Sequence, residues 1–298
     1  MTAPLLVIPL PGNEAMAEKL ARALGAELGI LLSRRFPDGE TYLRYETPLA
    51  RRSLALLCTL DRPDEKIVPL LFAAAAARDL GATRIGLIAP YLAYMRQDKR
   101  FHSGEAVTSE YFADLLSAHF DWLVTVDPHL HRHKAMTEIY AIPTVAAHSM
   151  PLIAAWIRKE IETPLIIGPD SESEQWVASV AHAASAPYVI LEKTRHGDRD
   201  VEISVPDVAR WRDHQAVLVD DIVSTAHTMI ETVKHLRRGG LKPPICMAVH
   251  GIFSGDAHQQ LIAAGAARIV TTNTVSHMTN EIDVAELLAE GLRARVLT

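Results

Sequence analysis

Residues 217–228 read Val-Leu-Val-Asp-Asp-Ile-Val-Ser-Thr-Ala-His-Thr, and this stretch predicts both a local structure and a chemistry. Three apolar residues end a buried strand, two carboxylates follow, and a hydroxyl-rich turn opens a helix. Adjacent carboxylates can accept hydrogen bonds from a vicinal diol, and the free backbone N–H groups of the turn suit a phosphate. A diol and a phosphate together describe a ribose 5-phosphate group. The alternative is an ordinary helix start, where acidic residues favour the positive end of the helix dipole.

The same alternation of strand and helix continues on both sides of this stretch. Short, nearly continuous apolar runs predict buried strands at Leu5–Leu10, Leu54–Leu60, Ile85–Ala89, Trp122–Val126, Leu165–Ile167, Tyr188–Leu191, Ala216–Val219, Ile245–Val249 and Arg268–Thr271. Helical patterns lie between them at Asn13–Leu24, Asp64–Leu80, Val107–Phe120, Met150–Ile161, Glu172–Ala184, Thr225–Arg238 and Asp256–Ala264. Repeated strand–helix–strand units predict an α/β fold with largely parallel sheets. The segment Arg34–Glu46 is an exception, because Pro37-Asp38-Gly39 is a turn signal that predicts a hairpin.

The length of 298 residues suggests two domains of ordinary size. No tandem repeat, low-complexity segment or long linker separates them, so the boundary must fall in a short connection. We expect it near Ala146–Ser149, at about half of the length. This divides the chain into a first domain of residues 1–147 and a second domain of residues 148–298.

The composition excludes several classes of protein. Apolar residues make up 49% of the chain and charged residues 22%, which is typical of a globular protein. The 30 Lys and Arg against 36 Asp and Glu give a net charge of −6, so no basic field attracts nucleic acid or a membrane surface. The two cysteines cannot build a disulfide framework or a four-cysteine zinc site. With no apolar run of membrane-spanning length and no basic segment before the first apolar run, we expect a cytoplasmic protein.

Charged and polar clusters follow the predicted strands, whereas the strands themselves are apolar. Ligands of parallel sheets bind beyond the carboxyl ends of the strands, so these clusters predict an anionic, metal-bound ligand. The chain contains no Gly-x-x-x-x-Gly-Lys-Ser/Thr segment, which argues against a P-loop kinase. It also lacks Gly-x-Gly-x-x-Gly after a strand, which argues against a dinucleotide site.

Six further segments, in order along the chain with residues 217–228, resemble motifs of the ribose-phosphate diphosphokinase family. They are Phe36-Pro-Asp-Gly-Glu40, Tyr94-Met-Arg-Gln-Asp-Lys-Arg100, Val126-Asp-Pro-His129, Gly168-Pro-Asp170, Leu191-Glu-Lys-Thr-Arg195 and Ile252-Phe-Ser-Gly255. The resemblance implies two type I phosphoribosyltransferase-like domains, each with a central, mostly parallel sheet flanked by helices. It also implies transfer of the β,γ-diphosphoryl group of ATP to the 1-hydroxyl of ribose 5-phosphate, giving 5-phosphoribosyl 1-diphosphate and AMP.

The resemblance assigns roles to the residues of these motifs. The first domain would contribute the ATP site, with Phe36, Asp38, Glu40, Arg96, Gln97, Asp98 and His129. The second would bind ribose 5-phosphate through Asp220, Asp221, Ser224, Thr225, Ala226, His227 and Thr228. Asp170 and Ser171 would belong to the diphosphate loop, and His129 and Asp170 would contact the Mg²⁺ of the donor. In this family Phe36 often reaches ATP across a subunit interface, which implies a homo-oligomer.

Lys193 and Arg195 are the catalytic candidates. Two cations spaced i, i+2 on an extended segment point to the same side, and phosphoryl transfer needs positive charge on the equatorial oxygens. A solvated loop is the alternative, and the wholly polar stretch His196–Asp200 supports it. The resemblance favours the catalytic interpretation, in which that stretch belongs to a lid that excludes water.

His129 lies in the run His129-Leu-His131-Arg-His133, which also invites interpretation as a zinc site. The i, i+2, i+4 spacing matches neither a zinc finger nor a zinc protease, and no cysteine is nearby. A lone histidine is more often a satisfied core or loop residue than a ligand. The resemblance therefore carries the assignment of His129 to the metal–nucleotide complex.

The chain departs from the family at Ala226 and His227, where the family usually has two glycines. Glycine permits close approach of the backbone to a phosphate and a positive φ, so a β-carbon at Ala226 could crowd the phosphate. His227 could instead donate a hydrogen bond to it. Two alternative functions remain: a phosphoribosyltransferase that consumes the same diphosphate, and a catalytically silent regulatory relative. The first would not need residues 36–40 and 96–100, and the second would be expected to lack Lys193, Arg195 or His129.

Overall fold

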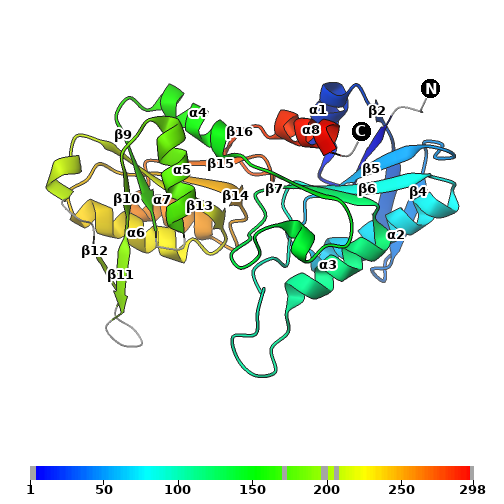
Figure 1. Cartoon of the computed structure of the whole chain (residues 1–298), viewed down its shortest axis with the longest axis horizontal. Helices are drawn as coiled ribbons and strands as arrows, with labels where there is room; N and C mark the ends of the chain where they lie inside the picture. Colours follow the sequence, from blue (N-terminus) through cyan, green and yellow to red (C-terminus); the bar gives the residue numbers. More distant parts are fainter. Residues whose placement is uncertain (1–4, 170–172, 196–200, 205–207, 296–298) are drawn as a thin grey trace. The chain divides into compact units, whose positions relative to one another are not determined.

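The computed structural model describes residues 5–169, 173–195, 201–204 and 208–295, and only the backbone of residues 175, 192–195, 201–204, 208, 209 and 295. The chain divides into two compact units (Figure 1). The first comprises Met1–His148 and Val284–Thr298, and the second comprises Ser149–Asp283. None of the helices in the described part of the chain has the length and apolar character needed to cross a membrane.

The first unit is a six-stranded parallel sheet with helices on both faces. Helices α1 and α8 lie on one face and α2 and α3 on the other (Figure 1). The strands, in spatial order, are β2 (Glu27–Leu28), β1 (Leu6–Pro9), β5 (Ser53–Leu57), β6 (Arg84–Ala89), β7 (Trp122–Val126) and β8 (Thr144–Ala147). The helices are α1 (Glu14–Leu24), α2 (Asp64–Asp79), α3 (Thr108–His119), α8 (Ala285–Arg295) and the short η1 (Met136–Glu138).

The predicted hairpin is present in the first unit. Strands β3 (Leu31–Arg35) and β4 (Thr41–Tyr45) pair in antiparallel register, with Arg35 opposite Thr41. The turn between them is closed by backbone hydrogen bonds from Phe36 N to Glu40 O (2.8 Å) and from Gly39 N to Phe36 O (2.9 Å). Gly39 has a φ of +95°, which a residue without a β-carbon adopts at no steric cost.

The second unit contains another six-stranded parallel sheet. Among its helices, α4 packs against α5 and α6 against α7. The strands, in spatial order, are β10 (Tyr188–Ile190), β9 (Pro164–Gly168), β13 (Gln215–Val223), β14 (Ile245–Gly251), β15 (Arg268–Thr272) and β16 (Asn280–Ile282). The helices are α4 (Met150–Glu160), α5 (Glu174–Ala184), α6 (His227–Arg238), α7 (Ala257–Ala264) and the short η3 (Val208–Trp211). Strands β11 (Glu192–Arg195) and β12 (Val201–Ser204) form a separate antiparallel pair.

The two sheets share one strand order. In each sheet, numbering the strands along the chain, the spatial order is 2-1-3-4-5-6. The second strand is therefore at one edge, beside the first, and the third to sixth strands follow on the opposite side of the first strand. In each, an antiparallel hairpin is inserted between the second and the third strand of the sheet. This order creates a switch point beside the first strand, between β1 and β5 in one unit and between β9 and β13 in the other. Ligands of open α/β sheets bind at such points, beyond the carboxyl ends of the strands.

The strands are apolar because helices cover both faces of each sheet. All five residues of β7 are buried, and each unit has its own cluster of buried apolar side chains. A close approach holds β6 to β7: a β-carbon on Gly86 would lie 1.8 Å from the Trp122 ring. The nine strands predicted from apolar runs are all present, and β13 continues to Val223, beyond its predicted end.

The C-terminal helix α8 corrects the predicted division of the chain into 1–147 and 148–298. The boundary near residue 148 corresponds to the division between the units, but α8 belongs to the first unit. Its Leu288, Ala289 and Leu292 are fully buried, and it packs against α1, β7 and β8. The sequence analysis predicts no helix for residues 285–295 and places the division at about half of the length, so these residues fell to the second domain.

Candidate active site

Strand β13 carries the two adjacent aspartates at its carboxyl end. Asp220 pairs with Ala248 of β14, and both aspartates are half-buried. The Asp220 Oδ1 atom accepts a hydrogen bond from the backbone N–H of Asp221 (2.9 Å). The Asp221 Oδ1 atom accepts one from the N–H of Ile222 (2.7 Å). These local bonds orient each carboxylate on the backbone.

The turn after β13 delivers the chain into the N-terminus of α6. Ala226 is the N-cap residue, and no side chain caps the first turn of the helix. Its carbonyl oxygen accepts the N–H of Ile230 (2.8 Å), so the helical hydrogen bonds begin there. Thr225 and His227 are exposed and Thr228 is half-buried, which leaves polar side chains around uncapped backbone N–H groups. Such a helix start favours an anion, because the N–H groups and the helix dipole both present positive charge.

Ala226 has a left-handed backbone, with φ +58° and ψ +8°. This is the conformation in which glycine has no steric cost, so alanine keeps the turn that a glycine would make here. The residue is 6% exposed and belongs to the buried apolar cluster of the second unit, together with Val223 and Met229. The β-carbon is thus part of the core packing beneath the turn.

A neighbouring loop braces this turn. The backbone N–H groups of Ile252 and Phe253, which follow β14, both donate to the carbonyl of Val223 (2.9 and 3.1 Å). Ser254 N donates to Ser224 O (3.0 Å), and the hydroxyls of Ser224 and Ser254 lie 3.1 Å apart. The motif at residues 252–255 therefore acts as a support for the turn at residues 224–226.

Strand β9 approaches the same edge of the second sheet and ends at Gly168. A β-carbon on Gly168 would lie 2.7 Å from Ile190 Cδ1 and 2.9 Å from Val177 Cγ2, so glycine lets α5 and β10 pack closely there. The predicted diphosphate-loop residues Asp170 and Ser171 lie outside the described residues.

The catalytic candidates Lys193 and Arg195 lie in β11. Lys193 is opposite Ile203 and Arg195 is opposite Val201 of β12. The extended backbone that the sequence predicted for this segment is confirmed, and alternate residues of a strand point to one face. The side chains of Lys193 and Arg195, like residues 196–200, lie outside the described part of the chain.

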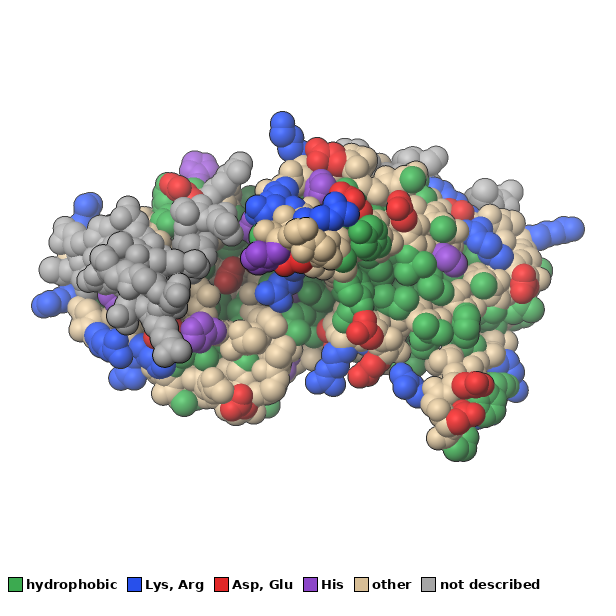
Figure 2. Space-filling view, turned by 90° about the horizontal axis from the view of Figure 1, so that it is seen from below, with side chains coloured by type: hydrophobic (Ala, Val, Ile, Leu, Met, Phe, Trp, Pro, Cys, Tyr) green, Lys and Arg blue, Asp and Glu red, His purple; other side chains and the backbone are tan. Residues whose placement is uncertain are grey.

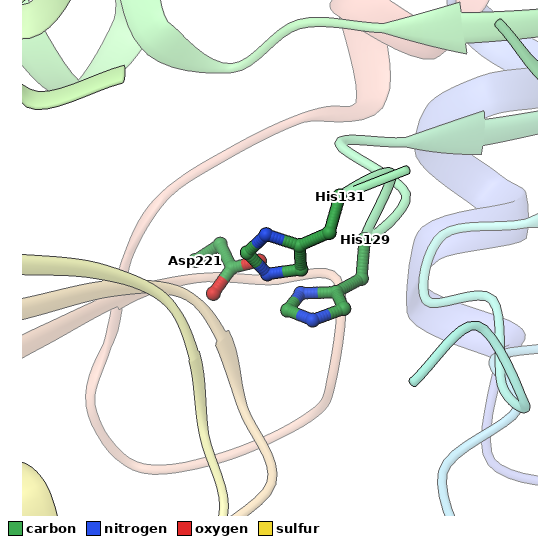
Figure 3. Close-up of side chains that lie close together, drawn as sticks. All are labelled: His129, His131 and Asp221. Carbon is green, nitrogen blue, oxygen red and sulfur yellow. The ribbon is translucent and has the colours of Figure 1, made fainter. Parts of the chain in front are cut away.

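In the first unit, the loop after β7 carries His129. The rings of His129 and His131 lie edge to face with their centroids 4.0 Å apart (Figure 3). Figure 3 also draws Asp221, which belongs to the second unit. His133 turns elsewhere, since its Nδ1 lies 3.3 Å from Glu138 Oε2.

Asp127 precedes this histidine loop and is fixed by its own partner. Its backbone is left-handed, with a φ of +33°. Its Oδ1 lies 3.0 Å from His148 Nδ1, and its side chain is 8% exposed. The hydrogen bond to Asp127 raises the pKa of His148 above its ordinary value, against the opposing effect of burial. The carboxylate is thus paired with His148 and holds the start of the loop.

The loop after β6 carries Arg96, Gln97 and Asp98. Arg96 is exposed and Gln97 half-buried, as expected of donors that meet a ligand. Asp98 differs, because its side chain is only 3% exposed and its Oδ1 accepts a hydrogen bond from Arg132 Nη1 (2.7 Å). The sequence analysis did not name this partner. Arg132 lies three residues after His129, and that short spacing from a candidate site residue is the signal that could have identified it.

The third group of predicted nucleotide contacts lies in the β3–β4 turn. Phe36 is 39% exposed, and the Arg34 guanidinium lies over its ring (4.8 Å) and over the Tyr42 ring (4.2 Å). The Asp38 Oδ1 accepts a hydrogen bond from Glu40 N (3.2 Å), which stabilises the tip of the turn. The exposed Phe36 ring is therefore held in place and open to a flat partner.

Comparison with known proteins is decisive for the family. Residues 5–119 match the N-terminal domain of ribose phosphate pyrophosphokinase, and residues 135–286 match the phosphoribosyl transferase domain. A ribose-phosphate pyrophosphokinase of Methanobrevibacter smithii is 31% identical over 300 residues, which cover 97% of this chain and 100% of the relative. The chain belongs to the ribose-phosphate pyrophosphokinase family. The resemblance inferred from its motifs is thereby confirmed.

Other members of the ribose-phosphate pyrophosphokinase family match over nearly the full length. The enzyme of that name from Methanothermobacter thermautotrophicus is 32% identical over 290 residues, covering 97% of this chain and 100% of the relative. The crystal structure of phosphoribosylpyrophosphate synthetase from Mycobacterium smegmatis has a TM-score of 0.86 and 25% identity, with 98% of each chain covered. The predicted fold class, an α/β fold of two phosphoribosyltransferase-like units, is confirmed by this match and by the two parallel sheets.

Proposed function

We propose that this chain is a ribose-phosphate pyrophosphokinase, which transfers the β,γ-diphosphoryl group of ATP to the 1-hydroxyl of ribose 5-phosphate. The products are 5-phosphoribosyl 1-diphosphate and AMP. The observation that carries the proposal is the position of Asp220 and Asp221 at the end of β13, directly before the uncapped start of α6. Carboxylates for a diol and free N–H groups for a phosphate thus stand a few residues apart on one strand–turn–helix unit.

For the acceptor sugar, we propose that Asp220 and Asp221 accept hydrogen bonds from the two ribose ring hydroxyls. The 5-phosphate binds at residues 224–228, where backbone N–H groups and the Thr225 and Thr228 hydroxyls donate to its oxygens. The exposed His227 adds a donor in place of a glycine. Support comes from the brace at residues 252–254, which fixes the turn before any ligand binds. A fixed turn loses little conformational freedom when the phosphate arrives.

For the donor, we propose that the loops of the first unit bind ATP. Phe36 stacks on the adenine ring while Asp38 and Glu40 contact its edge, and Arg96 and Gln97 donate to the polyphosphate. A phosphoribosyltransferase would not need this second set, so its presence favours the pyrophosphokinase reaction. We also propose that the chain forms a homo-oligomer in which the Phe36 turn serves a neighbouring subunit. The proposed location is the cytoplasm.

In the proposed transfer, the 1-hydroxyl oxygen of ribose 5-phosphate attacks the β-phosphorus of ATP. A bond forms between this oxygen and the β-phosphorus, the bond between the β-phosphorus and the α,β-bridging oxygen breaks, and AMP leaves with that oxygen. The hydroxyl proton passes to solvent. Lys193 and Arg195 are proposed to stabilise the charge on the oxygens of the β-phosphorus. Direct attack requires no covalent enzyme intermediate.

A divalent cation, proposed to be Mg²⁺, accompanies the donor. His129 and Asp170 are the proposed contacts from the two units. Asp220 and Asp221 supply further carboxylate oxygens, the donor type that Mg²⁺ prefers, in a half-buried setting that suits a partly hydrated ion. When bound, the ion would neutralise polyphosphate charge.

The test is an assay of AMP release with ATP, Mg²⁺ and ribose 5-phosphate. We expect AMP to form only when the sugar phosphate is present. Asp221→Asn should lower the rate of AMP formation at a given concentration of ribose 5-phosphate. Asp213→Asn is the matched control, because Asp213 is exposed and precedes the amino end of the same strand. If no AMP forms, but phosphoribosyl diphosphate is consumed with a purine or pyrimidine base, the chain is a transferase. Binding of both substrates without turnover would make it a silent relative.

A further inference from the structure

Asp98 and Arg132 join two loops at the carboxyl edge of the first sheet. Strands β6 and β7 are parallel neighbours, with Ala89 opposite Thr125, so the loops that follow them leave the sheet side by side. Asp98 lies in the first loop and Arg132 in the second. Their ion pair of 2.7 Å links a loop that carries Arg96 and Gln97 to a loop that carries His129.

The two partners of this pair are exposed to different extents. The Asp98 side chain is 3% exposed, whereas the Arg132 side chain is 41% exposed. A carboxylate withdrawn from water is costly unless a cation and hydrogen bonds satisfy it, so Asp98 is committed to Arg132. One Nη of Arg132 is used in this bond, and the planar guanidinium keeps further N–H donors for a ligand. A triphosphate approaching the pair would therefore meet the arginine and not the carboxylate.

Further cations surround the exposed arginine. The Lys99 ammonium lies 4.9 Å from the centre of the Phe101 ring, and the Arg132 guanidinium lies 5.4 Å from it. Phe101 is itself held in place, because its backbone N–H donates to Glu105 Oε2 (2.7 Å). In Figure 2 the tip of the long loop after β6 points toward the viewer, and Lys and Arg side chains gather on it. Positive charge of this density suits a polyphosphate.

We infer that Arg132 binds the polyphosphate of the nucleotide donor, and that Asp98 is a positioning residue that orients Arg132. The inference rests on the proposed function, because it names an additional residue of the donor site. It also reassigns Asp98, which would act through the arginine rather than by touching ATP. Arg132 then completes a cationic side of the donor site formed with Arg96, and the buried carboxylate fixes the fork of its guanidinium before the nucleotide binds.

The experiment compares the kinetics of Arg132→Gln, Arg132→Lys and Asp98→Asn with the wild-type chain. Arg132→Gln should raise the KM for ATP by about 10- to 100-fold, the effect of losing one charge-assisted hydrogen bond, and leave the KM for ribose 5-phosphate within about twofold. Arg132→Lys should restore part of the ATP affinity, since it keeps the charge but loses the fork. Calorimetric titration with ATP in the absence of ribose 5-phosphate should rank the affinities in the same order, with the wild-type chain tightest, Arg132→Lys intermediate and Arg132→Gln weakest.

The matched control is Arg78→Ala. Arg78 pairs with Asp121 in the same unit, at 3.2 Å and beside the amino end of β7, with 43% of the arginine and 33% of the aspartate side chain exposed. It should leave both KM values unchanged. If Asp98 acts only through Arg132, the double variant Asp98→Asn/Arg132→Gln should bind ATP as Arg132→Gln does.

Two results would overturn the inference. One is an unchanged affinity for ATP in Arg132→Gln, and the other is an equal rise in both KM values accompanied by a lower Tm, as a purely structural pair would give. If Arg132→Gln does not fold, Arg132→Lys replaces it as the test, because lysine retains the ion pair with Asp98 and loses only the planar guanidinium. An ATP affinity in Arg132→Lys equal to that of the wild-type chain would then overturn the inference. Failure of the proposed function would look different, since the wild-type chain would then release no AMP.

Discussion

Ala226 shows how one residue preserves a turn that usually relies on glycine. A left-handed conformation costs a residue with a β-carbon about 1–2 kcal/mol. Here the methyl group is buried among the apolar side chains of the second unit, which offsets part of that cost. The turn before α6 therefore keeps the shape that a glycine would give it, with its N–H groups at the uncapped helix start.

Lys193 carries the proposed charge stabilisation, and its removal should reduce turnover. We expect Lys193→Ala to lower kcat by about 10²–10³, by analogy with the loss of one preorganised stabiliser of transition-state charge. The KM for ribose 5-phosphate should change little. Lys159→Ala is a suitable control, because Lys159 is 81% exposed in the same unit. An unaltered kcat in Lys193→Ala would exclude the catalytic role.

The His148–Asp127 pair makes a prediction about pH. The hydrogen bond to Asp127 raises the pKa of His148 above its ordinary value of 6.5. A raised histidine pKa means that the pair's contribution to stability is fully present below pH 6.5 and is lost as the pH rises through the raised pKa. Titration of the His148 ring by NMR should show this raised pKa, and Asp127→Asn should bring it down. Identical pKa values in the two proteins would contradict the pairing.

At the scale of elements, the contact between β6 and β7 depends on Gly86. A β-carbon at this position would lie 1.8 Å from the Trp122 ring, so neither strand can stay in place around it. We expect Gly86→Ala to destabilise the protein by roughly 2–3 kcal/mol, as overpacked cores do. Thermal unfolding measures the loss, and a second change, Trp122→Leu, should restore part of it. A Tm of Gly86→Ala equal to that of the wild-type chain would contradict this prediction, because it would mean that β6 and β7 accommodate the extra methyl group without cost.

The elements also show what the sequence could predict. The central strands were found because burial on both faces demands a continuous apolar run, as in Trp122–Val126. Strands β2, β8 and β16 were missed because each is short and lies toward an edge of its sheet, where no such run is needed. The carboxylates of β13 were found because they interrupt an apolar run. The burial of Asp98 could not be predicted from the sequence, because its partner Arg132 comes from the loop that follows another strand.

At the scale of the whole molecule, the two units share one strand order but not one chemistry. In the second unit the switch point between β9 and β13 carries Asp220 and Asp221. In the first unit, at the corresponding point, the buried side chain of Asn13 joins the loops that follow β1 and β5. Its Oδ1 accepts the N–H of Thr59 (2.8 Å) and its Nδ2 donates to Leu10 O (3.1 Å). This amide therefore satisfies backbone groups of both loops.

The chain should therefore bind one ribose 5-phosphate. Calorimetric titration of the sugar phosphate is expected to give a stoichiometry near one per chain, because, among the residues that the structure describes, the paired carboxylates and the uncapped helix start occur together only in the second unit. Asp220→Asn combined with Asp221→Asn should abolish this binding. A stoichiometry of two, or binding that survives the double change, would place a sugar phosphate at the first unit as well.

The central claim is the transfer of a diphosphoryl group in one step, and phosphorus NMR of the reaction mixture tests it most directly. With ATP, Mg²⁺ and ribose 5-phosphate, the account predicts equal amounts of AMP and of a sugar that carries a 5-phosphate and a new diphosphate at carbon 1. Formation of ADP with a sugar bisphosphate would mean that only the γ-phosphoryl group moves, and that result would contradict the account.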